Sequence, residues 1–92
     1  MPEQIYSRIL KSGDVLFQEG EEGDNAYIVE TGAVEISLDL PSGKKVLATL
    51  GKGEIIGEMS LIADAPRSAT AIAAKDSELL VLKRDRLLKP IE

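Results

Sequence analysis

The 92-residue chain contains no cysteine and no histidine. Without cysteine it forms no disulfide and offers no thiolate for catalysis or metal binding. Without histidine it lacks the commonest general base and the commonest ligand of transition metals in proteins. Any enzyme built on this chain would depend on carboxylates, lysine, tyrosine or hydroxyl groups. We therefore expect neither an enzyme nor a metal site.

Aromatic residues and positive charge are also scarce. The aromatic side chains are Tyr6, Phe17 and Tyr27 alone, so the hydrophobic core has to be mainly aliphatic. The net charge of −5 provides no basic surface for nucleic acid. No apolar run approaches the roughly 18 residues that suggest a membrane span, and the N-terminus has no signal-peptide pattern. We expect a cytoplasmic protein that binds neither nucleic acid nor membrane.

The distribution of the eight glycines indicates the fold class. They divide the chain into segments of a few to about ten residues, which is typical of an all-β sandwich or barrel. We expect one domain over residues 1–92. Strands are predicted over residues 15–17, 26–30, 34–40, 44–50, 69–74 and 77–82, whereas residues 5–11 fit a strand or a short helix. A short helix is predicted over residues 84–89, ending near Pro90.

Residues 34–40 carry the clearest strand pattern. Val34, Ile36, Leu38 and Leu40 alternate with polar residues, which predicts one buried face and one solvent-facing face. The segment Pro41-Ser42-Gly43 is a turn, and residues 44–50 return as the partner strand. The two strands are expected to form a β-hairpin.

Three segments invite well-known ligand-binding interpretations that their spacing does not support. The acidic loop over residues 19–25 lacks the ligand spacing of an EF-hand calcium loop. Gly43-Lys44-Lys45 lacks the earlier glycine and the following hydroxyl residue of a phosphate-binding Walker loop. Residues 51–54 form a turn that precedes no β–α unit, unlike a dinucleotide-binding turn.

Residues 56–71 hold the densest polar chemistry in the chain. Gly57 lets the backbone enter a helical turn over residues 58–63, whose first amides are unpaired and attract anions. A phosphate is expected on the amides near Met59 and Ser60. Arg67 follows Pro66, and its planar guanidinium matches two phosphate oxygens, with Ser68 adding a hydroxyl group beside it.

Glu58 is a carboxylate next to a predicted phosphate site, and a carboxylate repels phosphate. Its presence is explained if it accepts hydrogen bonds from sugar hydroxyls, so that the two features together describe a nucleotide site. Two alternatives remain open from the residues alone. Glu58 caps its own helical turn, or Arg67 forms an ion pair with Glu58 or Asp64.

These residues resemble the phosphate-binding cassette of the cyclic-nucleotide-binding domain family. The family pattern is Gly-Glu, several mostly apolar residues, Pro or Ala before Arg, a small residue, Ala, and Thr or a similar residue. The chain has Gly57-Glu58, Leu61 and Pro66-Arg67-Ser68-Ala69-Thr70. Upstream, Gly13-Asp14, Glu19-Gly20, Asp24, Tyr27-Ile28-Val29 and Gly32 also match the family's order of glycines and strands. The resemblance extends from about residue 8 to about residue 89.

The resemblance implies a mainly β fold, an eight-stranded antiparallel β-roll of the double-stranded β-helix or jelly-roll type. One short helix follows residue 57, and a second lies at the C-terminus. The implied ligand is cAMP or cGMP, with no further cofactor. Its phosphate is held by Arg67, with help from Ser68 and the Met59 amide, and Ala69 completes the cassette. Glu58 and the Gly57 backbone hold the ribose 2′-hydroxyl, while Ile36 and Leu47 are candidate walls for the base, or core residues.

The resemblance also implies a regulatory, non-enzymatic role. Family members usually carry helices before the roll and a longer C-terminal helix that covers the base as a lid, and most of that lid is not expected within residues 1–92. We therefore expect a recognisable but open site, with an effector domain or a protein partner supplying the cover, or a homo-oligomer. The alternative is a degenerate member of the family that acts as a protein-interaction or oligomerisation module without nucleotide.

Overall fold

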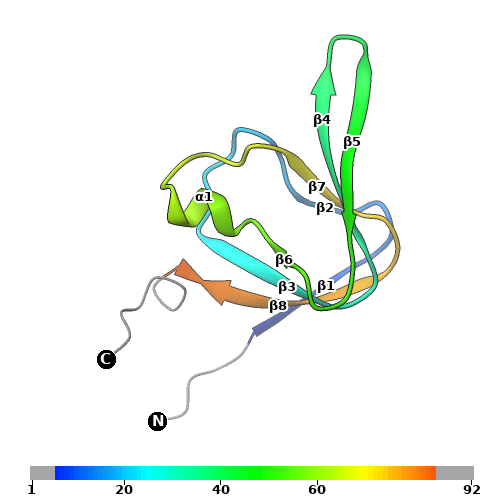
Figure 1. Ribbon diagram of the computed structural model, residues 1–92. Helices are drawn as coiled ribbons and strands as arrows, with labels where there is room; N and C mark the ends of the chain where they lie inside the picture. Colours follow the sequence, from blue (N-terminus) through cyan, green and yellow to red (C-terminus); the bar gives the residue numbers. More distant parts are fainter. Residues whose placement is uncertain (1–5, 85–92) are drawn as a thin grey trace.

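The computed structural model describes residues 6–84, which form two four-stranded antiparallel sheets and one short helix (Figure 1). The first sheet contains, in spatial order, β1 (Tyr6–Leu10), β8 (Ser77–Lys83), β3 (Asn25–Thr31) and β6 (Ile55–Ile56). The second contains β2 (Val15–Phe17), β7 (Thr70–Ala73), β4 (Val34–Leu40) and β5 (Gly43–Leu50). The helix α1 spans Glu58–Ile62. The predicted eight-stranded antiparallel β-roll is confirmed.

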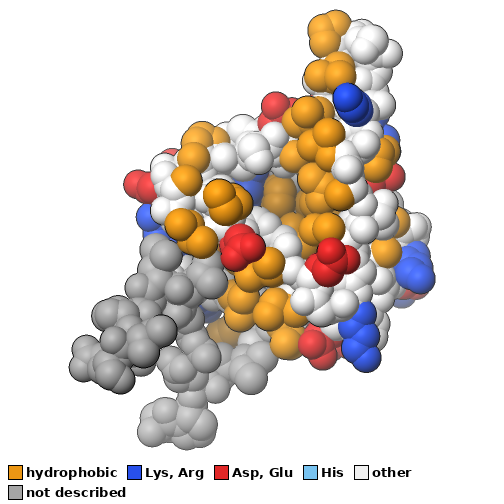
Figure 2. Space-filling model, viewed as in Figure 1, with side chains coloured by type: hydrophobic (Ala, Val, Ile, Leu, Met, Phe, Trp, Pro, Cys, Tyr) orange, Lys and Arg blue, Asp and Glu red, His pale blue; other side chains and the backbone are white. Residues whose placement is uncertain are grey.

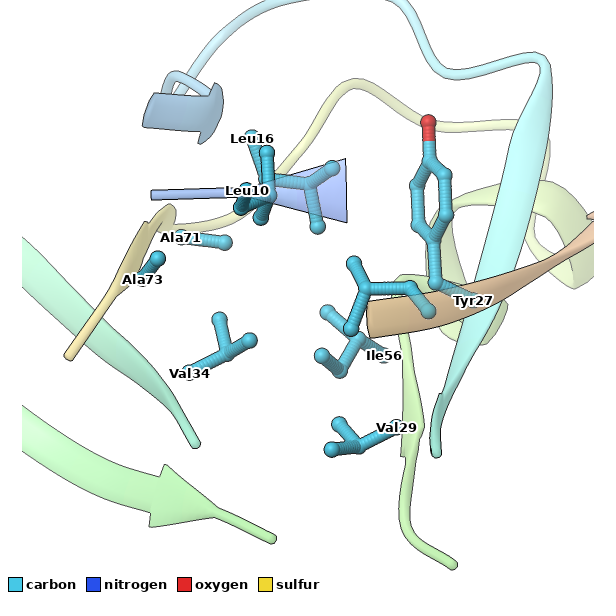
Figure 3. Close-up of a cluster of buried hydrophobic side chains, with 9 residues drawn as sticks. Leu10, Leu16, Tyr27, Val29, Val34, Ile56, Ala71 and Ala73 are labelled. Atoms are coloured by element: carbon cyan, nitrogen blue, oxygen red, sulfur yellow. The ribbon is translucent and has the colours of Figure 1, made fainter. Parts of the chain in front are cut away.

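The core lies between the two sheets, as Figure 3 shows. It is mainly aliphatic, as the shortage of aromatic residues predicts, because only Tyr27 among its buried members is aromatic. The cluster consists of Leu10, Leu16, Tyr27, Val29, Val34, Ile56, Ala71, Ala73 and Leu79. These residues come from seven of the eight strands, so burial of this one cluster holds the two sheets together.

Most predicted elements agree with the structure, one strand was missed, and one predicted helix is not tested. Residues 6–10 form a strand, β1, which resolves the choice between strand and helix. The two-residue strand β6 was not predicted, because Ile55 and Ile56 are too few to show a period. The helix predicted over residues 84–89 extends beyond Arg84 and so lies outside the described residues, as does any lid helix.

The hairpin of β4 and β5 is present, but its side chains do not divide into one buried face and one solvent-facing face as predicted. Leu40 is exposed because the end of the hairpin projects beyond the rest of the roll (Figure 1). On the other face Ser37 is only 1% exposed. The register also shifts: Ile36 is opposite Ala48 and Ser37 is opposite Val46, so Leu47 is an extra residue in β5. Such a bulge bends a strand and changes where its side chains point.

Candidate functional site

A hollow of about 210 Å³ lies between α1 and the β4–β5 hairpin. Figure 2 shows it bordered by hydrophobic side chains. It is lined by Phe17, Ile36, Leu50, Ile55, Ile56, Gly57, Glu58, Met59, Ser60, Arg67, Ser68 and Ala69. Eight of the nine predicted site residues therefore line one cavity. Leu47 is the exception: it is 49% exposed and does not contribute to the lining.

Arg67 lies in the loop between α1 and β7, and a second loop holds its backbone. The Arg67 N–H donates to the Glu21 carbonyl at 2.8 Å, and the Gly20 N–H donates to the Arg67 carbonyl at 2.8 Å. Within the preceding turn, the Ala65 N–H donates to the Ser60 carbonyl at 2.9 Å. The position of Arg67 thus depends on segments about 45 residues apart in the sequence.

The guanidinium of Arg67 is buried, with the residue only 5% exposed. Its Nη1 donates to the Gly57 carbonyl at 2.8 Å and to the Ser60 hydroxyl oxygen at 2.7 Å. Its Nη2 donates to the Asn25 carbonyl at 2.6 Å. The Nε–H is buried and has no hydrogen-bond partner among residues 6–84.

Two glycines leave space for this buried side chain, and an aromatic ring packs against it. Gly57 has φ of 82°, and a Cβ there would lie against Nη1 of Arg67. A Cβ at Gly23 would lie within 2.6 Å of Nε and 2.8 Å of Nη2. The guanidinium lies over the ring of Phe17, with 4.1 Å between Cζ and the ring centroid. Glycine is required at both positions because any side chain would occupy the space that the guanidinium fills.

No carboxylate from residues 6–84 forms an ion pair with Arg67. Within the described part of the chain, the ion pairs join Lys44 to Glu35 and Arg84 to Asp64. Burial lowers the pKa of the Arg67 guanidinium below its usual value, and Tyr27, Asp24 and Glu21 act in the opposite direction. The group nevertheless stays protonated, because an arginine side chain does not lose its proton in proteins.

Both alternatives to a nucleotide site are contradicted by these contacts. Asp64 pairs with Arg84 at 3.0 Å, and neither Asp64 nor Glu58 pairs with Arg67. Helix α1 has Gly57 at its N-cap and no side-chain capping hydrogen bond, so Glu58 does not cap it. Glu58 is half-buried at the cavity, with no hydrogen bond or ion pair to any residue in 6–84.

The remaining predicted residues surround Glu58 and Arg67. Met59 is 68% exposed at the edge of the cavity, while Ser60 is buried and hydrogen-bonded to Arg67. Ser68 is exposed and Ala69 is buried. The first amides of α1 have no partner within the helix, as in any helix. The cavity therefore combines a buried cation, a half-buried carboxylate and an apolar wall.

Several residues of the site were not predicted as such. Phe17, Leu50, Ile55 and Ile56 also line the cavity. Gly23 and Asn25 contact Arg67 from a distant loop. For Phe17 a signal was available, since it is one of only three aromatic residues in the chain.

Among residues 6–84 no group of three or more acidic side chains could hold a metal ion. No helix in this range is long and apolar enough to cross a membrane.

Comparison with known proteins agrees with this geometry: the model of the cyclic nucleotide-binding domain family matches residues 7–92. The chain belongs to this family. It is 40% identical, over 88% of its length, to the cyclic AMP receptor protein of Thermus thermophilus, and covers 38% of that protein. It is 36% identical, over 99% of its length, to the cAMP-dependent protein kinase regulatory subunit of Yarrowia lipolytica, and covers 24% of it. The chain thus spans well under half of each relative.

Solved structures show the same fold. The EAL enzyme Bd1971 in its cAMP-bound form has a TM-score of 0.88 and 38% identity, covering 91% of this chain and 23% of that one. The cGMP-bound form of the same enzyme gives the same TM-score of 0.88. These relatives include regulators and a multidomain enzyme, so what they share with this chain is the binding domain.

Proposed function

We propose that this chain binds a cyclic nucleotide, cAMP or cGMP, and serves as the regulatory sensor domain of a larger assembly. The observation that supports the proposal is the buried Arg67 guanidinium, which among the described residues has no carboxylate partner and no acceptor for its Nε–H. A buried donor left without a partner costs about 1–3 kcal/mol. An anionic ligand oxygen would remove that cost and neutralise the charge.

The other lining residues fit the remaining parts of a nucleotide. Glu58 is the acceptor for the ribose 2′-hydroxyl, since its carboxylate has no partner among the described residues. The amides of Met59 and Ser60 and the hydroxyl of Ser68 assist Arg67 at the phosphate, beside Ala69. Ile36 and Leu50 form an apolar wall for the base. The site binds without catalysis, and its output depends on an effector domain, a protein partner that covers the base, or a second copy of the chain.

The test is a calorimetric titration of cAMP and of cGMP into the wild-type chain and into Arg67→Ala. Removal of a buried charge-assisted contact should weaken binding by more than about 2 kcal/mol, or roughly 30-fold. Arg8→Ala is the matched control, because Arg8 is an exposed arginine on β1, outside the cavity lining. It should bind like the wild type.

Circular dichroism must show that each variant is folded. If the folded wild type gives no heat at millimolar ligand, the nucleotide proposal is wrong, and the chain is better explained as an interaction module. Equal binding by Arg67→Ala and Arg8→Ala would remove Arg67 from the site.

A further inference from the structure

We propose that Phe17 is a positioning residue for the ligand phosphate: its ring holds the Arg67 guanidinium in the plane that presents its free donors to the ligand. This inference rests on the proposed function and deepens it. Phe17 was absent from the residues predicted for the site, and it contacts both the guanidinium and the cavity.

The first step concerns which donors of Arg67 are free. Nη1 uses both of its N–H groups, on the Gly57 carbonyl and the Ser60 hydroxyl. Nη2 uses one, on the Asn25 carbonyl. Within residues 6–84, the Nε–H and one N–H of Nη2 remain without a partner. These two nitrogens are adjacent on the guanidinium, which is the arrangement that binds two oxygens of one phosphate.

The second step concerns what sets the plane of the guanidinium. Nη1 and Nη2 are held by hydrogen bonds, whereas Nε has none to any residue in 6–84. The centroid of the Phe17 ring lies 4.1 Å from Cζ, so the ring packs against the centre of the guanidinium. An aromatic ring also attracts the cation electrostatically, which an aliphatic side chain of similar size does not. The ring therefore adds a contact on the face of a planar group whose hydrogen bonds all lie at its two Nη atoms.

The third step concerns why the chain places an aromatic ring there. Val15 is opposite Ile72 and Phe17 is opposite Ala71, so Leu16 is an extra residue in β2. Leu16 is 6% exposed and belongs to the core, whereas Phe17 is half-buried and lines the cavity. An irregularity of this kind redirects side chains within a strand. In β2 it allows Leu16 to pack in the core while the next residue, Phe17, lines the cavity.

The experiment measures affinity and phosphate geometry together. Binding of cAMP and of its two phosphorothioate diastereomers, which place sulfur on one or the other exocyclic phosphate position, is measured for the wild type, Phe17→Leu, Phe17→Met and Phe17→Tyr. Loss of the ring should weaken cAMP binding about 3- to 30-fold, the range that cation–π energies give. Phe17→Tyr keeps the ring and should stay within about 3-fold of the wild type.

The ratio of the two diastereomer affinities is the decisive measurement. It depends on where the Arg67 donors point, so it should shrink toward one in Phe17→Leu and Phe17→Met but not in Phe17→Tyr. A general loosening of the fold weakens both diastereomers alike and leaves the ratio unchanged. Tyr6→Leu is the matched control, because Tyr6 also lies against a cation, Lys83, but on β1 and outside the cavity lining.

The outcomes separate the two proposals. If the folded wild type binds no cyclic nucleotide, the proposed function fails. If it binds and Arg67→Ala does not, but Phe17→Leu and Phe17→Met match Tyr6→Leu in affinity and ratio, the role of Phe17 is overturned and the nucleotide site stands. Two ring-deleting variants are used so that one that fails to fold does not leave the question unanswered.

Discussion

The cavity has one end at Arg67 and the other at the β4–β5 hairpin, and the two ends differ in how the side chains are held. At the first end Arg67 is 5% exposed and hydrogen-bonded to two carbonyls and a hydroxyl. At the second, Ile36 and Leu50 are half-buried, and Leu47 is 49% exposed. Recognition of a charge requires hydrogen-bond donors that are fixed in place and shielded from water. An apolar wall has no such requirement, because it acts only through the apolar surface that the ligand buries.

The comparison predicts that substitutions at the Arg67 end have large effects on binding and those at the hairpin have small ones. Gly57→Ala should have the largest. A Cβ at Gly57 would lie against Nη1 of Arg67, so the guanidinium has to move and the phosphate contact is lost. Affinity for cAMP, measured by calorimetry, should fall by more than about 2 kcal/mol.

Gly53→Ala is the matched control for that prediction. Gly53 has φ of 87°, close to the 82° of Gly57, but a Cβ there would meet nothing within 4 Å. Both variants force alanine into a left-handed conformation, which should cost about 1–2 kcal/mol in thermal unfolding, and Gly57→Ala should lose more because it also displaces Arg67. Equal affinity of the two variants for cAMP would show that the close approach to Arg67 is irrelevant to binding.

Glu58→Ala tests whether the carboxylate beside the proposed phosphate site recognises the sugar. Loss of hydrogen bonds to a charged acceptor should weaken cAMP binding by about 1.5 kcal/mol, at the low end of such values because Glu58 is only half-buried. The control is a ligand rather than a variant. The affinity for 2′-deoxy-cAMP should be nearly the same in the wild type and Glu58→Ala, and an equal loss for both ligands would contradict the assignment.

Leu47→Ala should have the smallest effect. Leu47 is the extra residue of the β5 bulge and does not line the cavity, so its removal should change cAMP affinity by less than about 0.5 kcal/mol. Ile36→Ala removes a lining residue and should weaken binding more. Equal losses of affinity in calorimetry would mean that Leu47 also contacts the ligand, because the hairpin closes over it. The difference between the rigid Arg67 end and the exposed hairpin end would then apply only to the free protein.

Much of the fold, and the polar residues that line the candidate site, could be predicted from the sequence. The alternation over residues 34–40 indicated the hairpin, and Gly57 with the residues after it indicated a helical turn, which is α1. Arg67 and Glu58 were identified from their chemistry and from the family pattern. The bulge at Leu47 and the burial of Ser37 were not predicted, because a period of two assigns side chains to faces but does not set the register or reveal which neighbours cover each face.

The sequence by itself determined the residue types at the site: one arginine after a proline, one glutamate after a glycine, and no histidine or cysteine to support other chemistry. Local spacing is enough for this, because turns, helix starts and strand periods depend on neighbouring residues. Only the tertiary structure decided what holds Arg67. Asn25 is 42 positions from Arg67 in the sequence, and Phe17 and Gly23 are similarly distant. Their contacts with Arg67 exist because the pairing of β2 with β7 and the hydrogen bonds between the two loops bring these segments together.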